Sequence, residues 1–356
     1  MLIEEMIKHP ASWLLATGDE CEVVLSSRVR LARNLEKHRF THNAGGDELA
    51  AILDESHSAA DQTKTFEDGF YFPMGSVPEL NRQFLVERHL VSTEFLSSSS
   101  NRGLVVNKSQ DVCLMINEED HLRLQAYSSG FDLMGALSRV NKLDNELAPK
   151  LEFAFSERLG FLTACPTNLG TGLRASVLMH LPGLVHSKEI HKLLEHLRKI
   201  HHSIRGLYGE GTDIMGNFFQ ISNSATLGSQ EEEILNNLGN VVTNLINLEQ
   251  QARKTILQKA RSLLEDKVWR AYGLLKYARR VDTKEALSLI SAVRLGMGMG
   301  IIGDLTVRKL NELLIYVQPA HLQIASGNTM DQSERDHTRA TYIRRKLSTP
   351  DNVQED

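Results

Sequence analysis

The chain changes character near Ser229, and this change constrains the fold more than any other feature. Before Ser229, short apolar or alternating segments typical of strands stand between helical patterns, whereas only helical patterns follow it. The later helices are expected at 230–262, 283–294, 304–317 and 334–346. We therefore predict an α+β domain over residues 1–255 and an all-helical domain over residues 256–356, with the boundary within or just after the long helix.

The strand candidates before Ser229 differ in pattern. Residues 111–116 form a continuous apolar run, which suits a buried strand. Residues 174–181 alternate, which places Arg174 and Ser176 on one face. Strands are also expected at 23–31, 153–155, 159–163 and 218–223, and helices at 1–16, 47–62, 78–96, 132–146 and 187–202. Residues 204–211 are predicted as a turn-rich loop.

Composition excludes several classes of protein. The formal net charge of -5 argues against a general nucleic-acid binder. Cys21, Cys113 and Cys165 form neither a disulfide framework nor a CxxC pair, which fits a reducing cytoplasm. No apolar run approaches the roughly 20 residues of a membrane span, and the N-terminus is amphipathic rather than a signal peptide. We expect a cytoplasmic protein without a membrane partner.

Several familiar motifs are absent or stand in an unsuitable context. Residues 298–303 match GxGxxG, but the preceding residues look helical, so this segment is predicted as a loop between helices. The chain has no Walker A motif and no protein-kinase signature set. It also has neither an HExxH motif nor a Cys/His cluster, so we expect no protein-held metal.

Residues 165–177, CPTNLGTGLRASV, place a thiol, a Gly-rich loop and an arginine close together. Backbone N–H groups of such a loop can approach an anion, and the Arg174 guanidinium suits phosphate oxygens. The alternative is a surface loop with a buried, inert Cys165. This stretch alone favours neither interpretation.

Other residues supply partners for this loop. Arg28, Arg30, Arg123, Arg174 and Arg205 lie at strand ends or in loops, and five such arginines could clamp a triphosphate. The remaining candidates are Glu119, Glu210 and Cys165. Carboxylates beside a phosphate clamp make sense if the acceptor is a guanidinium, which is a poor nucleophile until it loses a proton. Spacing alone does not prove that these residues converge.

Four motifs make the interpretation specific. SSRVRLARN at 26–34, NEEDHLR at 117–123, CPTNLGTGLRASV at 165–177 and RGLYGE at 205–210 resemble the ATP:guanido phosphotransferase (phosphagen kinase) family. The resemblance implies an antiparallel sheet flanked by helices, with Glu119, Glu210 and Cys165 as catalytic residues. The ATP-binding residues that it implies are Ser26, Ser27, Arg28, Val29, Arg30, His89, Arg123, Arg174, Ala175, Ser176, Val177, Leu178, Arg205, Gly206, Leu207, Tyr208, Gly209 and Glu210.

The layout resembles one branch of this family. Phosphagen kinases carry a helical domain before the catalytic one, whereas here the first phosphate-binding motif begins at residue 26 and a helical region follows. The order and motifs resemble the bacterial protein-arginine kinases, which phosphorylate arginine side chains in proteins. The absence of a lid for a small substrate would suit an arginine on a polypeptide.

A C-terminal motif agrees with this branch. Residues 335–340, RDHTRA, match the RDxxRA motif that forms a phosphoarginine-binding pocket in the family. On a helix, Arg335 and Arg339 are i,i+4 neighbours whose repulsion a phosphate would relieve, and Asp336 could accept from the guanidino group of the ligand. The resemblance assigns an allosteric pocket to Arg335, Asp336, His337, Thr338, Arg339 and Ala340. The alternative is a solvated basic helix.

The leading hypothesis is a protein-arginine kinase that uses ATP and Mg²⁺, with the metal held by phosphates and water. By resemblance, its substrates are proteins with exposed arginines, and its partners are a Clp-type chaperone-protease, an activator protein and a heat-shock repressor. The resemblance also implies a role in the stress response and a homodimer. The alternatives are a kinase of a small free guanidino compound and a non-catalytic phosphoarginine-binding adaptor.

Overall fold

Eight strands form one antiparallel sheet in the computed structural model, which describes residues 2–96, 100–206, 215–224 and 226–349. The strand order is β2-β3-β4-β5-β1-β8-β10-β9. The strands are β1 (Val24–Arg33), β2 (Phe70–Pro73), β3 (Gly103–Val106), β4 (Val112–Ile116), β5 (Leu122–Ser129), β8 (Leu173–His180), β9 (His202–Arg205) and β10 (Phe218–Asn223). A small separate hairpin pairs β6 (Phe155–Ser156) with β7 (Gly160–Phe161).

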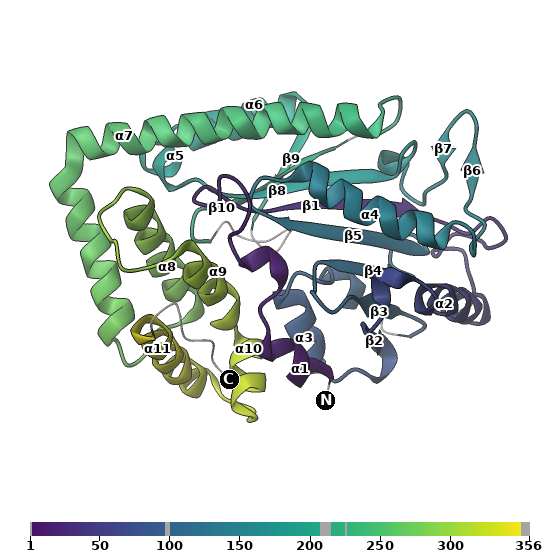
Figure 1. Ribbon diagram of the computed structural model, residues 1–356, viewed down its shortest axis with the longest axis horizontal. Coiled ribbons are helices and arrows are strands. Elements are labelled where there is room, and N and C mark those ends of the chain that lie inside the picture. The colour runs from purple at the N-terminus through teal and green to yellow at the C-terminus, as the bar shows by residue number, and fades with distance from the viewer. Residues whose placement is uncertain (1, 97–99, 207–214, 225, 350–356) are drawn as a thin grey trace.

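Helices cover the sheet and then form the C-terminal part of the molecule (Figure 1). The α-helices are α1 (Leu2–Lys8), α2 (Gly46–Asp61), α3 (Glu79–Glu87), α4 (Leu133–Leu147), α5 (Pro182–His186), α6 (Ile190–Lys199), α7 (Glu231–Tyr277), α8 (Thr283–Gly298), α9 (Val307–Tyr316), α10 (Pro319–Ser326) and α11 (Gln332–Ser348). Single 3₁₀ turns are η1 (Ser12–Leu14), η2 (Lys64–Phe66), η3 (Met74–Ser76), η4 (Glu94–Leu96) and η5 (Pro166–Asn168).

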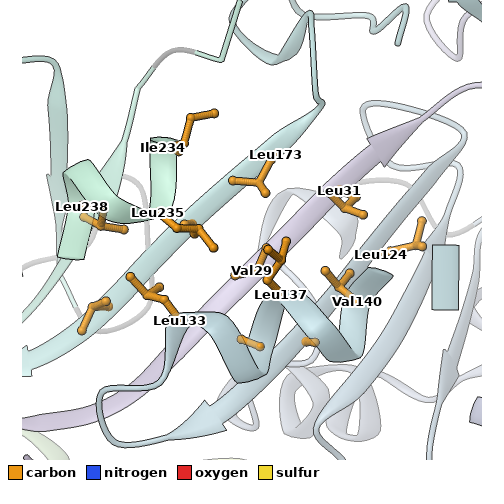
Figure 2. Close-up of a cluster of buried hydrophobic side chains, with 14 of the residues drawn as sticks. Val29, Leu31, Leu124, Leu133, Leu137, Val140, Leu173, Ile234, Leu235 and Leu238 are labelled. Atoms are coloured by element: carbon orange, nitrogen blue, oxygen red, sulfur yellow. The ribbon is translucent and has the colours of Figure 1, made fainter. Parts of the chain in front are cut away.

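One face of the sheet is apolar and forms the main core. Along β1, Val29 and Leu31 alternate with the arginines and point to this face, where Figure 2 shows them beside side chains of α4 and α7. The α4 side chains are Leu133, Leu137 and Val140, and those of α7 are Ile234, Leu235 and Leu238. Each fully buried aliphatic side chain stabilises the fold by about 1.5–3 kcal/mol. The opposite face packs a second apolar cluster over β2, β3 and β4, and its polar side chains lie on β1, β5, β8 and β10.

Helix α7 joins the sheet to the C-terminal helices. Its first half packs on the apolar face, and its second half contributes Val268, Ala271 and Leu275 to a separate core with α8. The backbone leaves helical geometry at Ala260 (φ -143°, ψ 35°). Figure 1 shows the helix turning sharply along its length, so two helical segments joined by a kink at Ala260 line two cores.

The sequence prediction of an α+β fold with a helical C-terminal region is confirmed. In the part of the chain that the structure describes, no strand follows β10, and 299–306 connects α8 to α9 as predicted. Several elements differ from the prediction. The helix expected at 1–16 ends at Lys8, shortly before Pro10, because proline disfavours helical geometry in the residue that precedes it.

The helix expected at 78–96 ends at Glu87, because His89 has a left-handed backbone (φ 60°). Strands β2, β3, β5 and β9 and helices α5 and α10 were not predicted, and β9 overlaps the expected loop only at residues 204–205. The proposed domain boundary near residue 255 stays a prediction.

Candidate active site

The polar face of the sheet gathers the five predicted arginines. In the β1–β8 register Arg30 lies opposite Arg174, and Arg28 lies opposite Ser176. Directly opposed residues of antiparallel strands project on the same side, so these side chains share one face. On the other side of β1, Gln125 and Tyr127 face Arg30 and Arg28, which places Arg123 on this face by alternation. The pairing of Arg205 with Gln220 extends the same face to β9.

The arginines are close enough to act on one another. Burial lowers the pKa of Arg123 most, and the positive charges of Arg28, Arg174 and Arg205 lower it further. Like charges on neighbouring groups disfavour the charged forms. A ligand with several negative charges would relieve this repulsion.

Arg28 has only neutral partners among the described residues. Its guanidinium donates to the Ser176 hydroxyl (3.2 Å), the Tyr127 hydroxyl (3.2 Å) and the Gln220 side-chain carbonyl (3.0 Å). These contacts fix its orientation without neutralising its charge. A phosphate oxygen is the type of ligand that such a site favours.

A small cavity adjoins Arg28 on this face. Its lining residues are Trp13, Ser26, Arg28, His89, Tyr127, Ser176, Leu178 and Gln220. The set includes five of the predicted ATP-binding residues. The His89 imidazole is buried, which lowers its pKa to about 3, so the ring is neutral at physiological pH.

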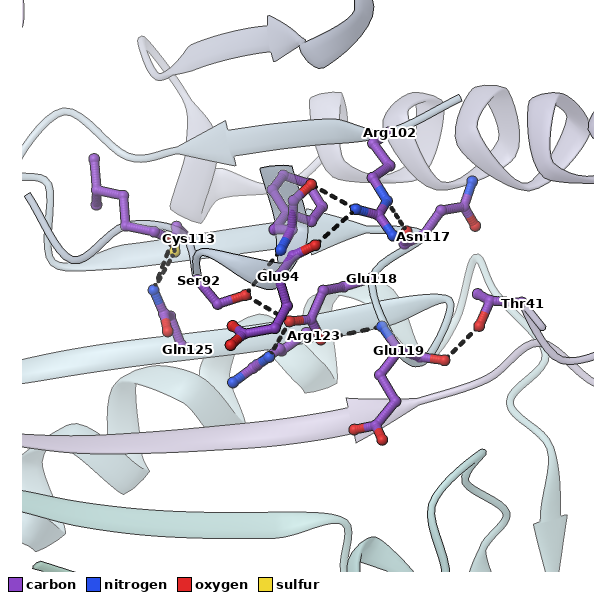
Figure 3. A network of polar contacts seen from close by, with 12 residues as sticks. Thr41, Ser92, Glu94, Arg102, Cys113, Asn117, Glu118, Glu119, Arg123 and Gln125 are labelled. Atoms are coloured by element: carbon purple, nitrogen blue, oxygen red, sulfur yellow. Dashed lines mark hydrogen bonds and ion pairs between the residues drawn. The ribbon is translucent and has the colours of Figure 1, made fainter. Parts of the chain in front are cut away.

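The loop between β4 and β5 places an acid beside the arginines. Glu118 accepts from the Ser92 hydroxyl (2.7 Å) and is in contact with the Arg123 guanidinium, while its second oxygen accepts from the Glu119 backbone N–H (3.1 Å). Figure 3 shows the Glu119 carboxylate directed away from the Glu118–Arg123 contact. Glu118 therefore holds both Arg123 and the Glu119 backbone in place.

Glu119 has the environment of a proton acceptor. Its pKa is raised first by burial and then by the charges of Asp120 and Glu118. Arg174 and a hydrogen bond from Asn168 act in the opposite direction. A carboxylate with a raised pKa is a better general base than an ordinary surface glutamate, and the influence of Arg174 shows that Glu119 borders the arginine face.

The Cys165 loop is tied to the acid loop through Asp120. One Asp120 oxygen accepts from the Asn34 amide and from the Ala164 backbone N–H, both at 2.6 Å. The Asn168 side chain, three residues after Cys165, lowers the pKa of both Glu119 and Asp120. The structure thus brings the predicted thiol and carboxylate into neighbouring loops, and the Cys165 sulfur lies 3.0 Å from the Thr167 hydroxyl.

Some predicted ATP-binding residues do not reach this face. Val29, Ala175 and Val177 belong to the apolar core, because alternation turns their side chains away from the arginines. The Ser27 hydroxyl is also buried there, where it donates to the Gly130 carbonyl (2.9 Å). These four side chains therefore do not project from the polar face, and their assignment to ATP binding stays a prediction.

The remaining predicted residues fall into two groups. Gly206 is buried directly after β9. Leu207, Tyr208, Gly209 and Glu210 lie outside the residues that the structure describes. Their assigned roles stay predictions.

The C-terminal motif lies on α11, away from the arginine face. Arg339 is 1% exposed and donates to the carbonyls of Val317 (2.8 Å) and Val281 (2.9 Å) and to the Asp336 carboxylate (2.7 Å). Arg335 is half-buried and donates to the Met330 carbonyl (2.9 Å).

Asp336 and two carbonyls therefore already accept hydrogen bonds from the Arg339 guanidinium. The sequence alone had suggested a phosphate as the partner of this charge. Of the other motif residues, His337 is exposed, Thr338 is half-buried and Ala340 is buried.

Sequence reasoning missed several residues of the site. Trp13 comes from the N-terminal segment, Tyr127 and Gln220 from strands of the polar face, and Asn168 and Glu118 from the two loops. The alternation of Arg123, Gln125 and Tyr127 with apolar residues was a readable signal for a strand. Nothing in the sequence indicated that Trp13 lies near His89.

Two kinds of feature are absent from the described residues. No group of three or more His, Cys, Asp or Glu side chains among them could hold a metal ion. None of the helices seen in that part of the chain has the length and apolar character to cross a membrane.

Similarity to known proteins identifies the family of this chain. Residues 51–252 match the C-terminal catalytic domain of ATP:guanido phosphotransferases, and residues 261–356 match the C-terminal domain of the protein-arginine kinase McsB. The chain belongs to the protein-arginine kinase branch of the ATP:guanido phosphotransferase family. It is therefore an enzyme of the guanidino-phosphotransferase class.

Curated relatives span the whole chain. The protein-arginine kinase of Desulforamulus reducens is 42% identical over 356 residues, covering 99% of this chain and 100% of the relative. That of Bacillus subtilis is 41% identical over 339 residues, covering 95% of this chain and 93% of the relative. The similarity thus includes both the sheet and the C-terminal helices.

Solved structures share the fold of the sheet region. A lombricine kinase superimposes with a TM-score of 0.58 at 27% identity, covering 67% of this chain and 70% of its own. The duplicated taurocyamine kinase of Schistosoma mansoni, bound to transition-state analogue components, gives 0.59 at 28% identity and covers 69% of this chain and 36% of its own. Both names describe kinases of guanidino compounds.

Proposed function

We propose that this protein transfers the γ-phosphate of ATP to arginine side chains of other proteins. The observation that carries the proposal is the arginine face with Glu119 at its border, in a chain whose relatives are named protein-arginine kinases. Arg28, whose partners among the described residues are all neutral, suits a phosphate oxygen, and the Glu119 carboxylate beside the arginine face suits a cationic acceptor.

The chemistry follows from the charges. Arg28, Arg123 and Arg174 bind phosphate oxygens of ATP and stabilise the charge that develops during transfer. Glu119 accepts a proton from the arginine side chain of the substrate, whose nitrogen then attacks the γ-phosphorus. A nitrogen–phosphorus bond forms, the bond from the γ-phosphorus to the bridging oxygen breaks, and ADP leaves with that oxygen.

The other predicted groups complete this mechanism. Cys165, as a thiolate, would add a negative contact to the guanidinium, and Glu210 would supply the second carboxylate. Mg²⁺ would be held by the ATP phosphates and water rather than by protein side chains. It would neutralise phosphate charge during transfer.

A direct assay tests the reaction. The purified protein is incubated with Mg²⁺, ATP and a disordered arginine-containing protein, and phosphoarginine is sought by mass spectrometry at neutral pH, because the N–P bond is acid-labile. We expect phosphoarginine on the protein. Turnover of free arginine or another small guanidino compound, without protein modification, would establish the small-substrate alternative. Binding of phosphoarginine without any transfer would establish the adaptor alternative.

The cellular role is proposed from the family. We propose that the enzyme acts in the cytoplasm, marks proteins for a Clp-type chaperone-protease, responds to an activator protein and phosphorylates a heat-shock repressor in the stress response. Comparing phosphoarginine sites in cells with and without the gene, before and after heat shock, tests this role.

We also propose that the α11 motif binds phosphoarginine and controls activity allosterically. Arg335 is the better candidate for contact with the phosphate, because Arg339 is buried among carbonyls. Addition of free phosphoarginine to the wild type and to Arg335→Ala tests the assignment.

A homodimer through the helical region is proposed as well. The second half of α7 exposes Leu263 (73%), Trp269 (51%), Leu274 (46%) and Tyr277 (74%), which supports a contact with another copy. Light scattering of the wild type and of Leu263→Glu tests this proposal, and we expect a dimer only for the wild type.

A further inference from the structure

Arg88 connects three parts of the molecule. It directly follows α3 and is fully buried. Its guanidinium donates to His321 Nε2 (2.8 Å), the Tyr316 hydroxyl (3.0 Å) and the Gln110 side-chain carbonyl (2.9 Å). Further bonds reach the carbonyls of His9 (3.0 Å) and Met6 (3.2 Å). The C-terminal helices α9 and α10, the N-terminal segment and the sheet region thus meet at one side chain.

The geometry fixes the protonation of His321. Nε2 accepts from Arg88, so Nδ1 carries the proton and donates to the Glu87 carboxylate (2.7 Å). Burial and the charge of Arg88 lower the pKa of His321 well below its usual value, which agrees with a neutral ring. Glu87 also accepts from the backbone N–H groups of Ala320 (2.8 Å) and His321 (3.0 Å). The consecutive residues Glu87 and Arg88 therefore bind the two nitrogens of the His321 ring on α10.

The residue after Arg88 belongs to the candidate nucleotide site. The His89 carbonyl accepts from the Tyr127 hydroxyl (2.6 Å) and from the Gln125 amide (3.2 Å). The Tyr127 hydroxyl in turn accepts from Arg28 (3.2 Å). Hydrogen bonds therefore connect His321 to Arg88 and the His89 carbonyl to Tyr127 and Arg28, and the peptide bond between Arg88 and His89 joins the two sets.

An aromatic contact runs beside this chain. The Trp13 ring lies 5.7 Å from both the His89 ring and the Tyr127 ring, between centroids. It also belongs to a buried cluster with Ile315 of α9. Trp13 and His89 line the cavity beside Arg28. Helix α9 therefore supports one wall through Trp13, and α10 supports another through Arg88 and the adjacent His89.

We propose that Arg88 is a positioning residue for ATP binding. Its bonds to Tyr316 and His321 let the C-terminal helices set the placement of His89, Tyr127 and Arg28, and hence the affinity for the nucleotide. The inference rests on the proposed function only in assigning Arg28 to ATP phosphates. It predicts that loss of an Arg88 contact on α9 or α10 weakens nucleotide binding although no residue of the arginine face is substituted.

Two pairs of variants separate positioning from simple stabilisation. His321→Asn keeps an N–H near the Nδ1 position for Glu87 and removes the acceptor for Arg88, whereas His321→Gln keeps an acceptor near Nε2 and loses the donor to Glu87. Tyr316→Phe removes the hydroxyl that accepts from Arg88 and donates to the Ile7 carbonyl (3.0 Å). Its control is Tyr272→Phe, which removes a hydroxyl bonded to Asp304 (2.7 Å) elsewhere in the C-terminal helices.

ADP binding is measured by calorimetry, which needs no phosphate acceptor, and folding is checked by thermal melting. We expect the Kd for ADP to rise about five- to tenfold in His321→Asn and Tyr316→Phe, within the range of ordinary coupling between sites. It should stay within about twofold of wild type in His321→Gln and Tyr272→Phe. Equal Kd values in all four folded variants, whatever their melting temperatures, would overturn the proposal.

The outcome is independent of the proposed reaction. A wild type that binds ADP but phosphorylates no protein would refute the function and leave the Arg88 test intact. Phosphorylation of protein arginines together with unchanged ADP binding in Tyr316→Phe and His321→Asn would refute the positioning role alone.

Discussion

We expect substitution by methionine to affect two arginines of the same strand differently. Arg28 and Arg33 both lie on β1, but Arg28 has three neutral acceptors, whereas Arg33 forms a two-point contact with Asp144 at 3.1 and 2.8 Å. Arg33 is 1% exposed and also donates to the carbonyls of Ala32 and Thr171. The first arrangement is that of a ligand site and the second that of a structural ion pair.

The expected stabilities follow from these contacts. Arg28→Met loses three hydrogen bonds to neutral groups, about 1 kcal/mol each. It also removes the repulsion between Arg28 and Arg123, whose pKa the Arg28 charge lowers, and this gain offsets part of the loss. The net loss of ligand-free stability should therefore be less than about 3 kcal/mol. Arg33→Met leaves Asp144 without its partner and should cost about 3–5 kcal/mol.

Urea unfolding of the ligand-free proteins and ADP calorimetry measure the two effects. Loss of a charge-assisted contact, about 1.5–3 kcal/mol, should weaken ADP binding by Arg28→Met about 10- to 150-fold. If Arg28→Met lowers the free energy of unfolding as much as Arg33→Met does, Arg28 is a structural residue and the argument for an anion site fails.

Three further predictions concern catalysis and control. Glu119→Ala should lower kcat about 10²- to 10⁴-fold while the Kd for ADP stays within about twofold, and normal turnover would exclude a general-base role. Asn168→Ala removes a bond that lowers the pKa of Glu119. A base acts when deprotonated, so activity falls as pH drops through its pKa, and the acid limb of the kcat profile should move to higher pH; a shift to lower pH would contradict this. Arg335→Ala should weaken the response to added phosphoarginine with basal kcat unchanged, whereas Arg339→Ala should lower the melting temperature, because it removes three buried bonds.

Local patterns were sufficient for much of the fold. Alternation over 174–181 predicted both the strand and the shared face of Arg174 and Ser176, because the side-chain period of an extended chain is two residues. The helical character after Ser229 was equally readable. Strand β5 was missed although Arg123, Gln125 and Tyr127 alternate, because the acidic cluster before it also fits the start of a helix.

The sequence by itself determined the element types, the arginine-rich motifs and their family. Only the tertiary structure decided which residues meet. Sequence spacing could not show that Arg30 lies opposite Arg174, because strand register joins segments far apart in the chain. It could not show that Trp13 and His321 support the site, or that Arg339 is buried, since burial and long-range hydrogen bonds arise only when separate elements pack together.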